Sequence, residues 1–353
     1  MPKIKIQPLN NRVTILPEKA TKGAKVFKCS YIDPFSSDKT SRIHDESKRL
    51  SDHAAKHYQK LGIRPKRTSR VDWTNPATTE IFDKTKFPAI HRWRTKYVPT
   101  AEALIPLQRP DLGMLYDGTV LSNEEAAWFA HTLDAIGLRS RAAVMQEVLA
   151  RISKKAEYKN WLSLASGASL PILQAAVEVK KSNKEPSITA VDYDKNALKI
   201  SKNLASQFDV RKFKISRANI LDEKSLRKVL KDKKSDVVEI LGLFEYLNEE
   251  DWFYRYHKVV VRFKRKLLGA KNFLNLAYSF VDVGGVLIFG NMLDSHPHLS
   301  FTLDVIQWPH IKPRSIKEVL DIVKHAQLPG KYEISIYLPE DGVYALYVLH
   351  RIS

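Results

Sequence analysis

The chain has 353 residues and a formal net charge of +19, and 44% of its residues are hydrophobic. This length and apolar content predict one sizeable domain with an appendage, or two domains. The single cysteine excludes an internal disulfide framework and a cysteine-rich zinc site. We find no signal-peptide pattern and no apolar run near the roughly 20 residues of a membrane span, so we expect a cytoplasmic protein.

The positive charge is concentrated in the first part of the chain. Residues 1–100 hold 22 Lys and Arg against 9 Asp and Glu, which accounts for +13 of the +19. Such a bias attracts phosphates and raises encounter rates with anionic partners. A solvated surface that only keeps the protein in solution has the same composition, so charge alone does not identify a partner.

The first 115 residues show no sustained apolar period and no internal repeat. Residues 1–50 mix Pro, Lys, Ser and Asn around one short strand pattern at residues 12–16, and a short helix is predicted over residues 51–62. We therefore expect residues 1–115 to form a basic N-terminal extension that is partly irregular.

Helical periodicity becomes clear at residue 122. Ser122 and Glu125 have the spacing of a capping box, which predicts the start of a helix. Gly137 is expected to interrupt this pattern, and a second amphipathic helix is predicted over residues 139–155. We expect residues 116–158 to form a helical lid over one side of a ligand site.

Strand and helix patterns alternate over residues 159–353. One long, basic and aromatic helix is predicted over residues 251–280, and Ser315 with Glu318 forms a second capping box. This order predicts an α/β fold of the Rossmann-like, doubly wound class, with a mostly parallel seven-stranded sheet whose last strand is antiparallel. The strands are predicted at residues 161–165, 188–192, 212–216, 236–241, 286–289, 332–337 and 343–349.

The turn after the first of these strands carries the most informative pattern. Gly167 has no Cβ, so the backbone can turn sharply and approach a ligand there. Asp192 ends the next strand about 25 residues later, near the spacing of a carboxylate that binds ribose, so the expected ligand is an adenosine derivative. Ala168 and Ser169 stand where a pyrophosphate-binding turn needs glycine, which favours S-adenosylmethionine over a nicotinamide dinucleotide.

Five motifs in order make residues 159–353 resemble the class I S-adenosylmethionine-dependent methyltransferases. They lie at residues 162–167, 191–192, 218–222, 236–247 and 283–288. Ser163 stands where the family usually has an acid, and Val283 where it usually has proline. The resemblance implies methyltransferase activity with S-adenosylmethionine as the cofactor. The residues that it implies for cofactor binding are Ser163, Ala165, Ser166, Gly167, Asp192, Tyr193, Asn219, Ile220, Leu243 and Tyr246.

A narrower resemblance covers about the last third of the chain. Residues 242–247, 291, 296–297 and 303–314 are similar to a bacterial subgroup that includes enzymes proposed to methylate the carboxyl group of hydroxy fatty acids. Glu245, where Asp is more usual, and Pro309 depart from that pattern. The resemblance implies a small-molecule or lipid-like acceptor that is methylated on oxygen or nitrogen.

Methyl transfer is an in-line displacement, so it obliges the protein to supply few side chains. A general base assists when the acceptor is a hydroxyl or an amine, and the candidates are His296, His298 and Glu245, which follow strands at the carboxyl edge of the sheet. The alternatives are loop histidines that bond backbone and a carboxylate that complements a helix dipole. The candidates for contact with the acceptor are Tyr116, Trp308 and Arg314, and ordinary packing or a surface ion pair is the alternative for these.

Two other functions remain open from the sequence. Basic and aromatic residues are interleaved at residues 64–70 and 91–97, a composition typical of proteins that bind single-stranded nucleic acid by stacking and charge. An RNA methyltransferase is therefore an alternative, although nucleic acid is not the favoured partner. The other alternative is a catalytically inactive binding module that keeps the fold. It is suggested by the single glycine in the turn and by Ser163, which stands where the family usually has an acid. No metal site is expected, since the histidines are scattered.

Overall fold

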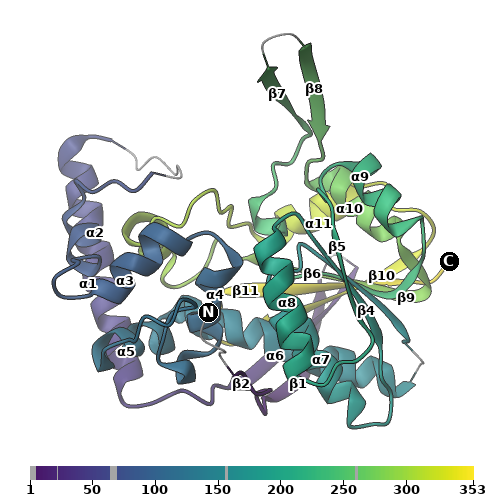
Figure 1. The fold of residues 1–353 in the computed structure, drawn as a ribbon, viewed down its shortest axis with the longest axis horizontal. Helices are drawn as coiled ribbons and strands as arrows, with labels where there is room; N and C mark the ends of the chain where they lie inside the picture. Colours follow the sequence, from purple (N-terminus) through teal and green to yellow (C-terminus); the bar gives the residue numbers. More distant parts are fainter. Residues whose placement is uncertain (1–4, 22, 64–69, 156–157, 259–260) are drawn as a thin grey trace.

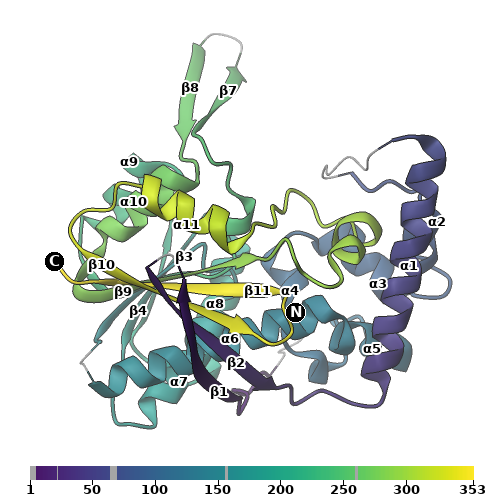
Figure 2. The ribbon, with the colours of Figure 1, turned by 180° about the vertical axis from the view of Figure 1, so that it is seen from behind.

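A nine-stranded mixed sheet forms the centre of the computed structural model, which describes residues 5–21, 23–63, 70–155, 158–258 and 261–353. Its strand order is β1-β2-β10-β11-β9-β6-β3-β4-β5 (Figures 1 and 2). The strands are β1 (Arg12–Thr21), β2 (Ala24–Ile32), β3 (Asn160–Leu164), β4 (Ser187–Asp192), β5 (Phe213–Arg217), β6 (Ser235–Ile240), β9 (Val281–Met292), β10 (Tyr332–Pro339) and β11 (Tyr344–Arg351).

The middle of the sheet is parallel. β3 runs parallel to β4 and β6, β4 to β5, and β6 to β9, whereas β11 is antiparallel to both β9 and β10. The predicted mixed sheet with helices is confirmed, but the predicted number of seven strands is wrong. The two further strands come from the N-terminal segment, because β2 pairs with β10 in parallel and β1 pairs with β2. Residues 12–32 therefore extend the sheet.

Six helices cover the two faces of the sheet. They are α6 (Leu133–Lys155), α7 (Leu170–Lys180), α8 (Lys195–Gln207), α9 (Glu223–Leu230), α10 (Ala270–Ser279) and α11 (Ile316–His325). Buried side chains of α6, α7 and α8 share one apolar cluster with the sheet, and those of α9, α10 and α11 share another. Within the part of the chain that the structure describes, no helix has the length and apolarity needed to traverse a bilayer.

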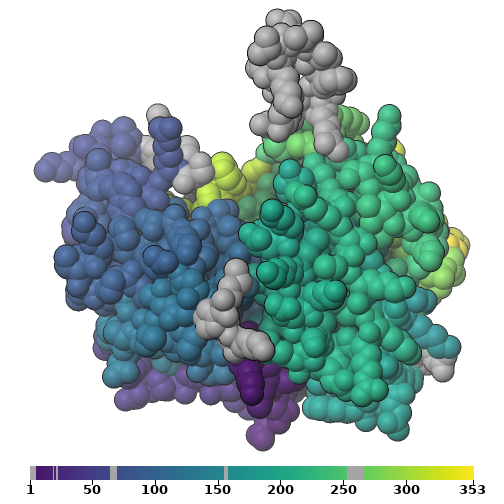
Figure 3. Space-filling model, viewed as in Figure 1, coloured from purple at the N-terminus to yellow at the C-terminus, as the bar shows by residue number. Residues whose placement is uncertain are grey.

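Five N-terminal helices pack beside the sheet instead of on its faces. They are α1 (Lys39–Leu61), α2 (Pro76–Ile81), α3 (Pro88–Arg92), α4 (Ala101–Gln108) and α5 (Asn123–His131). Their apolar side chains form a third cluster with the segment that follows β9, which includes Phe301 and Ile311. In the space-filling view these N-terminal residues, in blue, meet the residues after β3, in teal and green, along one boundary (Figure 3).

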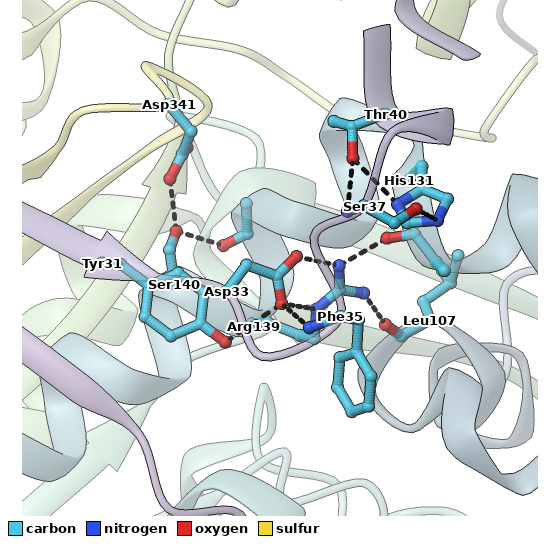
Figure 4. Close-up of polar contacts among 12 residues, drawn as sticks. Tyr31, Asp33, Phe35, Ser37, Thr40, Leu107, His131, Arg139, Ser140 and Asp341 are labelled. Carbon is cyan, nitrogen blue, oxygen red and sulfur yellow. Dashed lines mark hydrogen bonds and ion pairs between the residues drawn. The ribbon is translucent and has the colours of Figure 1, made fainter. Parts of the chain in front are cut away.

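A buried ion pair ties the N-terminal hairpin to this helical part. Arg139 on α6 donates to both carboxylate oxygens of Asp33, at 3.1 and 2.6 Å, and to the backbone oxygens of Leu107 and Ala130 at 2.6 and 2.5 Å (Figure 4). Both partners are buried. Since a buried charge needs a partner and further hydrogen bonds, these contacts hold the exit of β2 against α4, α5 and α6.

The structure corrects two of the predicted helices. Residues 251–280 are not one helix, because β7 (Trp252–Lys258) and β8 (Val261–Leu267) pair as an antiparallel hairpin that precedes α10. This hairpin stands away from the main sheet (Figures 1 and 2). Gly137 lies inside α6 without interrupting it, and a Cβ there would come within 2.5 Å of the Val343 side chain. The glycine thus permits close packing of α6 on the start of β11.

Candidate active site

A cleft opens at the carboxyl ends of β3, β4 and β6, and the turn after β3 forms its floor. Ala165, Ser166, Gly167 and Asp192 line it. The Gly167 N–H donates to Asp192 Oδ2 at 2.9 Å, and the Asp194 N–H donates to Oδ1 at 2.9 Å. Burial raises the pKa of Asp192, and these amide donors oppose the shift. The carboxylate is therefore fixed in place, with acceptor capacity remaining on both oxygens.

The turn itself adopts a conformation that glycine usually supplies. Ala165, Gly167 and Ser169 have φ values of 51°, 51° and 57°, so every second residue lies in the left-handed region. Ser169 is held there by a contact of 2.5 Å between its Oγ and that of Ser201. The turn has the alternating backbone of a glycine-rich loop, but two of its three left-handed residues carry a Cβ.

A second carboxylate, which was not predicted as a site residue, also lines the cleft. Glu239 on β6 is the register partner of Ser163 on β3, and Ser163 Oγ donates to Glu239 Oε2 at 2.6 Å. Burial raises the pKa of Glu239, while this hydroxyl and the Leu241 N–H oppose the shift. The sequence signal was a charged residue within the apolar run of residues 236–241.

An apolar chamber that is partly open to solvent adjoins the cleft. Its wall combines aliphatic with aromatic side chains, and the aromatic ones include Trp93, Trp128, Phe129, Phe301, Trp308 and Tyr344. The first three come from the N-terminal helical part, whereas the others come from the segment after β9 and from β11. The chamber therefore forms only when residues more than 150 positions apart pack together.

Three charged side chains line this largely apolar chamber: Arg141, Glu245 and Asp134. Arg141 Nη1 lies 3.4 Å from Glu245 Oε1, and the guanidinium carbon stands 4.1 Å from the centre of the Tyr344 ring. Burial raises the pKa of Glu245, and Arg141 opposes the shift. Gly290 on β9 makes room for the arginine, because a Cβ there would lie 3.0 Å from Arg141 Cδ.

Cleft and chamber share part of their wall. Leu104, Arg141, Gly242, Tyr246 and Trp308 line both. Trp308 Nε1 donates to the Tyr246 hydroxyl at 2.6 Å, which fixes both rings at this junction. A molecule in the cleft and a molecule in the chamber would therefore meet at the junction.

The structure brings together some of the residues that were predicted to bind the cofactor. Ala165, Ser166, Gly167, Asp192 and Tyr246 line the cleft. Ser163 is buried below the cleft and donates to Glu239. Tyr193 is exposed, and the Arg217 guanidinium lies 5.3 Å from the centre of its ring. Asn219 accepts from the Leu221 N–H at 3.1 Å, and Ile220 and Leu243 pack in the core on the α9 side of the sheet.

The predicted base candidates occupy different places. Glu245 lies in the chamber near the junction. His296 lies behind Asp134, with Nε2 3.5 Å from Oδ1, and its Nδ1 accepts from the His298 N–H at 2.9 Å. The His298 ring packs edge-on against His44 at 5.1 Å between ring centres. The two histidines thus form part of the contact between α1 and the loop after β9.

The predicted acceptor-binding residues also separate. Trp308 lines both cavities. Arg314 is buried and donates to the Phe244 and Leu247 backbone oxygens at 3.1 and 2.5 Å and to Asn291 Oδ1 at 2.9 Å, so it holds the loop after β6. Tyr116 is half-buried and packs against the apolar cluster on the α6 side of the sheet.

In the basic and aromatic cluster at residues 91–97, Trp93, Arg94 and Tyr97 are buried, whereas Arg92 and Lys96 are exposed and pair with Asp117 at 2.6 and 3.0 Å. Trp93 lines the chamber, Tyr97 packs in the same cluster, and Arg94 donates to the Ile306 and Gln307 backbone oxygens at 2.8 and 2.7 Å. These side chains therefore form the chamber wall and its support, where they are not accessible to a nucleic acid. Residues 64–69 of the other basic cluster lie outside the described residues.

No family model matches the chain, and no curated protein matches it either. Among solved structures it is similar to an O-methyltransferase family protein from Burkholderia thailandensis, with 17% identity, a TM-score of 0.44, and 63% of this chain and 60% of that protein covered. It is also similar to the S-adenosylmethionine-dependent methyltransferase SibL, with 12% identity, a TM-score of 0.45, and 89% and 77% covered. At such scores, function has to be inferred from this chain's own cleft and chamber.

Proposed function

We propose that the protein is an S-adenosylmethionine-dependent methyltransferase that methylates an oxygen or nitrogen of a small, largely apolar molecule. The observation that carries this proposal is the junction of the cleft and the chamber at Gly242, Tyr246 and Trp308. The cleft lies where the strand order reverses, since β4 follows β3 on one side and β6 lies on the other. Ligands of open α/β sheets bind at such a point.

The residues of the cleft fit an adenosine ligand without a pyrophosphate. Asp192 is placed to accept hydrogen bonds from ribose hydroxyls, and Ser166 Oγ is buried without a partner among the described residues. The Cβ atoms of Ala165 and Ser169 occupy the turn that a pyrophosphate would need open. These features support S-adenosylmethionine as the cofactor.

The bound cofactor supplies a methyl group activated by a positively charged sulfur. Tyr246 and Trp308 form the rigid wall along which the acceptor is aligned, and the aromatic chamber excludes water. Glu245 is the best placed of the predicted proton acceptors, because it lines the chamber beside Arg141, which lines both cavities. Its raised pKa makes it a stronger base than an ordinary carboxylate for an acceptor that carries a proton.

We also propose that residues 1–115 and 116–158 close the chamber. Ile81, Trp93 and Trp128 from these segments form one side of it, and Phe301 and Trp308 form the other. Following the narrower sequence resemblance, we propose that the apolar acceptor is a lipid-like acid. The aromatic wall suits such a molecule, since it offers a large apolar surface with few polar groups.

Calorimetry with S-adenosylhomocysteine tests the proposal. We expect binding to the wild-type protein, weakened about 10- to 100-fold by Asp192→Ala, because a charge-assisted hydrogen bond contributes roughly 1.5–3 kcal/mol. Asp192→Asn, which preserves the shape of the side chain, should give an intermediate loss. Asp209→Ala changes an exposed carboxylate just beyond the opposite end of α8 from Asp192 and should bind like the wild type. Folded wild-type protein that gives no binding heat would reject the proposal.

A further inference from the structure

Arg141 on α6 stands between the cleft and the chamber. Among the described residues it is the only charged side chain that lines both cavities. The cleft contains the buried carboxylate of Glu239, and the chamber contains that of Glu245. Burial raises the pKa of each carboxylate, and Arg141 opposes the shift at both. One guanidinium therefore acts on two carboxylates, one in each cavity.

The Arg141 guanidinium is buried but poorly bonded. Among the described residues its hydrogen-bond acceptor is Glu245 Oε1, and the distance of 3.4 Å from Nη1 is longer than an ordinary hydrogen bond. Its Nε is buried and has no partner within the same residues. A guanidinium carries five N–H donors in a planar fork, and burying them without acceptors is costly. Arg141 can therefore bind a further carboxylate.

S-adenosylmethionine would bring such a carboxylate into the cleft. In the proposed complex its ribose lies on Asp192 and its sulfur lies at the junction, and a short aliphatic chain joins that sulfur to an ammonium and a carboxylate. Arg141 lines the same junction. A bidentate pair of arginine with a carboxylate is stronger than the single long contact to Glu245. A carboxylate in the cleft would therefore compete with Glu245 for Arg141.

Glu245 depends on Arg141 for its negative charge. Burial raises the pKa of Glu245, and the cations that oppose the shift are Arg141 and, more weakly, Arg314 before α11, which is bonded to the loop after β6. The ionisable groups of Tyr246 and Tyr344 carry no positive charge, and burial and Glu245 raise their pKa values. Glu245 Oε2 is buried and unpartnered in the described part of the chain. Without Arg141, this carboxylate would bind a proton more readily.

We propose that Arg141 couples the two cavities: its guanidinium pairs with the carboxylate of S-adenosylmethionine when the cleft is filled, and Glu245, released from that contact, accepts the proton of the molecule in the chamber. This inference rests on the proposed function and states when Glu245 becomes a base. With the cleft empty, Glu245 keeps its contact with Arg141 and leaves the acceptor protonated. The base is thus active only when a methyl group is present.

The methyl transfer then balances within the two cavities. An oxygen or nitrogen of the acceptor forms a bond to the methyl carbon, the carbon–sulfur bond breaks, and its electron pair stays on sulfur. The proton of that oxygen or nitrogen passes to Glu245 Oε2. The positive charge of the sulfonium and the negative charge of Glu245 both disappear, and an apolar surrounding favours such a step.

Proton uptake on binding of S-adenosylhomocysteine tests the coupling. Calorimetry in buffers of different ionisation enthalpy measures the protons that the complex takes up. For the wild type we expect at least about 0.3 proton per ligand between about pH 5.5 and 7.5, because Glu245 loses its cationic partner. 5′-Methylthioadenosine has the same adenosine part but no amino acid end, so it should bind without this uptake.

The same coupling predicts a pH dependence of affinity. A ligand whose binding takes up a proton binds more tightly as pH falls. The dissociation constant of 5′-methylthioadenosine divided by that of S-adenosylhomocysteine should therefore rise as pH falls. Both ligands carry the ribose, so titration of Asp192 cancels from this ratio.

Matched variants assign the two groups. Glu245→Gln should abolish the uptake, since an amide does not titrate in this range. Arg141→Met should abolish it too, and should weaken S-adenosylhomocysteine about tenfold or more while 5′-methylthioadenosine stays within about twofold. Glu147→Gln and Arg151→Met change an ion pair further along α6 and should behave like the wild type. If Arg141→Met does not fold, the two ligands on the wild type still decide the question.

The remaining outcomes overturn the inference. Binding of S-adenosylhomocysteine without proton uptake, or the same uptake with 5′-methylthioadenosine, would exclude the coupling and leave the proposed function standing. Uptake that persists in Glu245→Gln would place the proton on another group, such as Glu239. Wild-type protein that does not bind S-adenosylhomocysteine would reject the proposed function itself, and the coupling with it.

Discussion

The turn after β3 shows how far single residues could be predicted. The sequence indicated one open glycine, Gly167, and a carboxylate, Asp192, at the end of the next strand, and the structure places the two in contact. It did not indicate that Ala165 and Ser169 adopt left-handed conformations, because residue type alone gives no such signal for alanine or serine. The role of Arg314 could not be predicted either, because its backbone partners come from a loop about 70 residues earlier in the chain.

Relief of backbone strain at Ala165 is a direct prediction at this scale. Ala165→Gly should raise the free energy of unfolding by about 1 kcal/mol, because a residue with a Cβ pays roughly that amount in the left-handed region. Urea denaturation measures the change. The neighbouring Ala168→Gly is the control, and it should lower stability by about 0.5–1 kcal/mol, since Ala168 is not left-handed. Equal losses in both variants would contradict the turn geometry.

At the scale of elements, hydrophobic periodicity predicted helices correctly where the pattern was long. It predicted them wrongly where a strand pattern was also present. Both capping boxes form as predicted, at the starts of α5 and α11. Residues 252–267 instead alternate in the β-branched and aromatic manner of strands, and their basic character was misread as helical. Gly137 was read as a helix break because its tertiary contact with Val343 is invisible in sequence.

The contact between α1 and the loop after β9 gives a pH prediction. Burial lowers the pKa of His44, whose ring meets that of His298, and burial lowers the pKa of His298 as well. A lowered folded-state value means that the unfolded chain binds the proton more readily below about pH 6.5. The stability contributed by His44 is thus present above that pH and is lost as pH falls toward the folded-state value.

Thermal unfolding between pH 7.5 and 5.0 measures this contribution. The melting temperature of the wild type should fall with pH more steeply than that of His44→Gln, which removes the titrating group. His53→Gln lies on the same helix at an exposed position and should retain the wild-type slope. A His44→Gln slope equal to that of the wild type would show that this histidine is not buried against its neighbours.

At the scale of the whole molecule, the alternation of strands and helices was predictable, whereas the chamber was not. Regular patterning is local, so it indicated the sheet and its helices. The chamber depends on Trp93 and Trp128 packing against Phe301 and Trp308, and no sequence spacing reports such long-range contacts. The N-terminal extension is accordingly part of the architecture, with two strands in the sheet and the helices that wall the chamber.

A crystal structure of the protein soaked with S-adenosylhomocysteine tests the central claim most directly. The account predicts that the ribose hydroxyls bond the Asp192 carboxylate and that the sulfur points to the junction at Gly242 and Tyr246, facing the chamber. An empty cleft at saturating ligand, or a ligand whose sulfur faces away from the chamber, would contradict it.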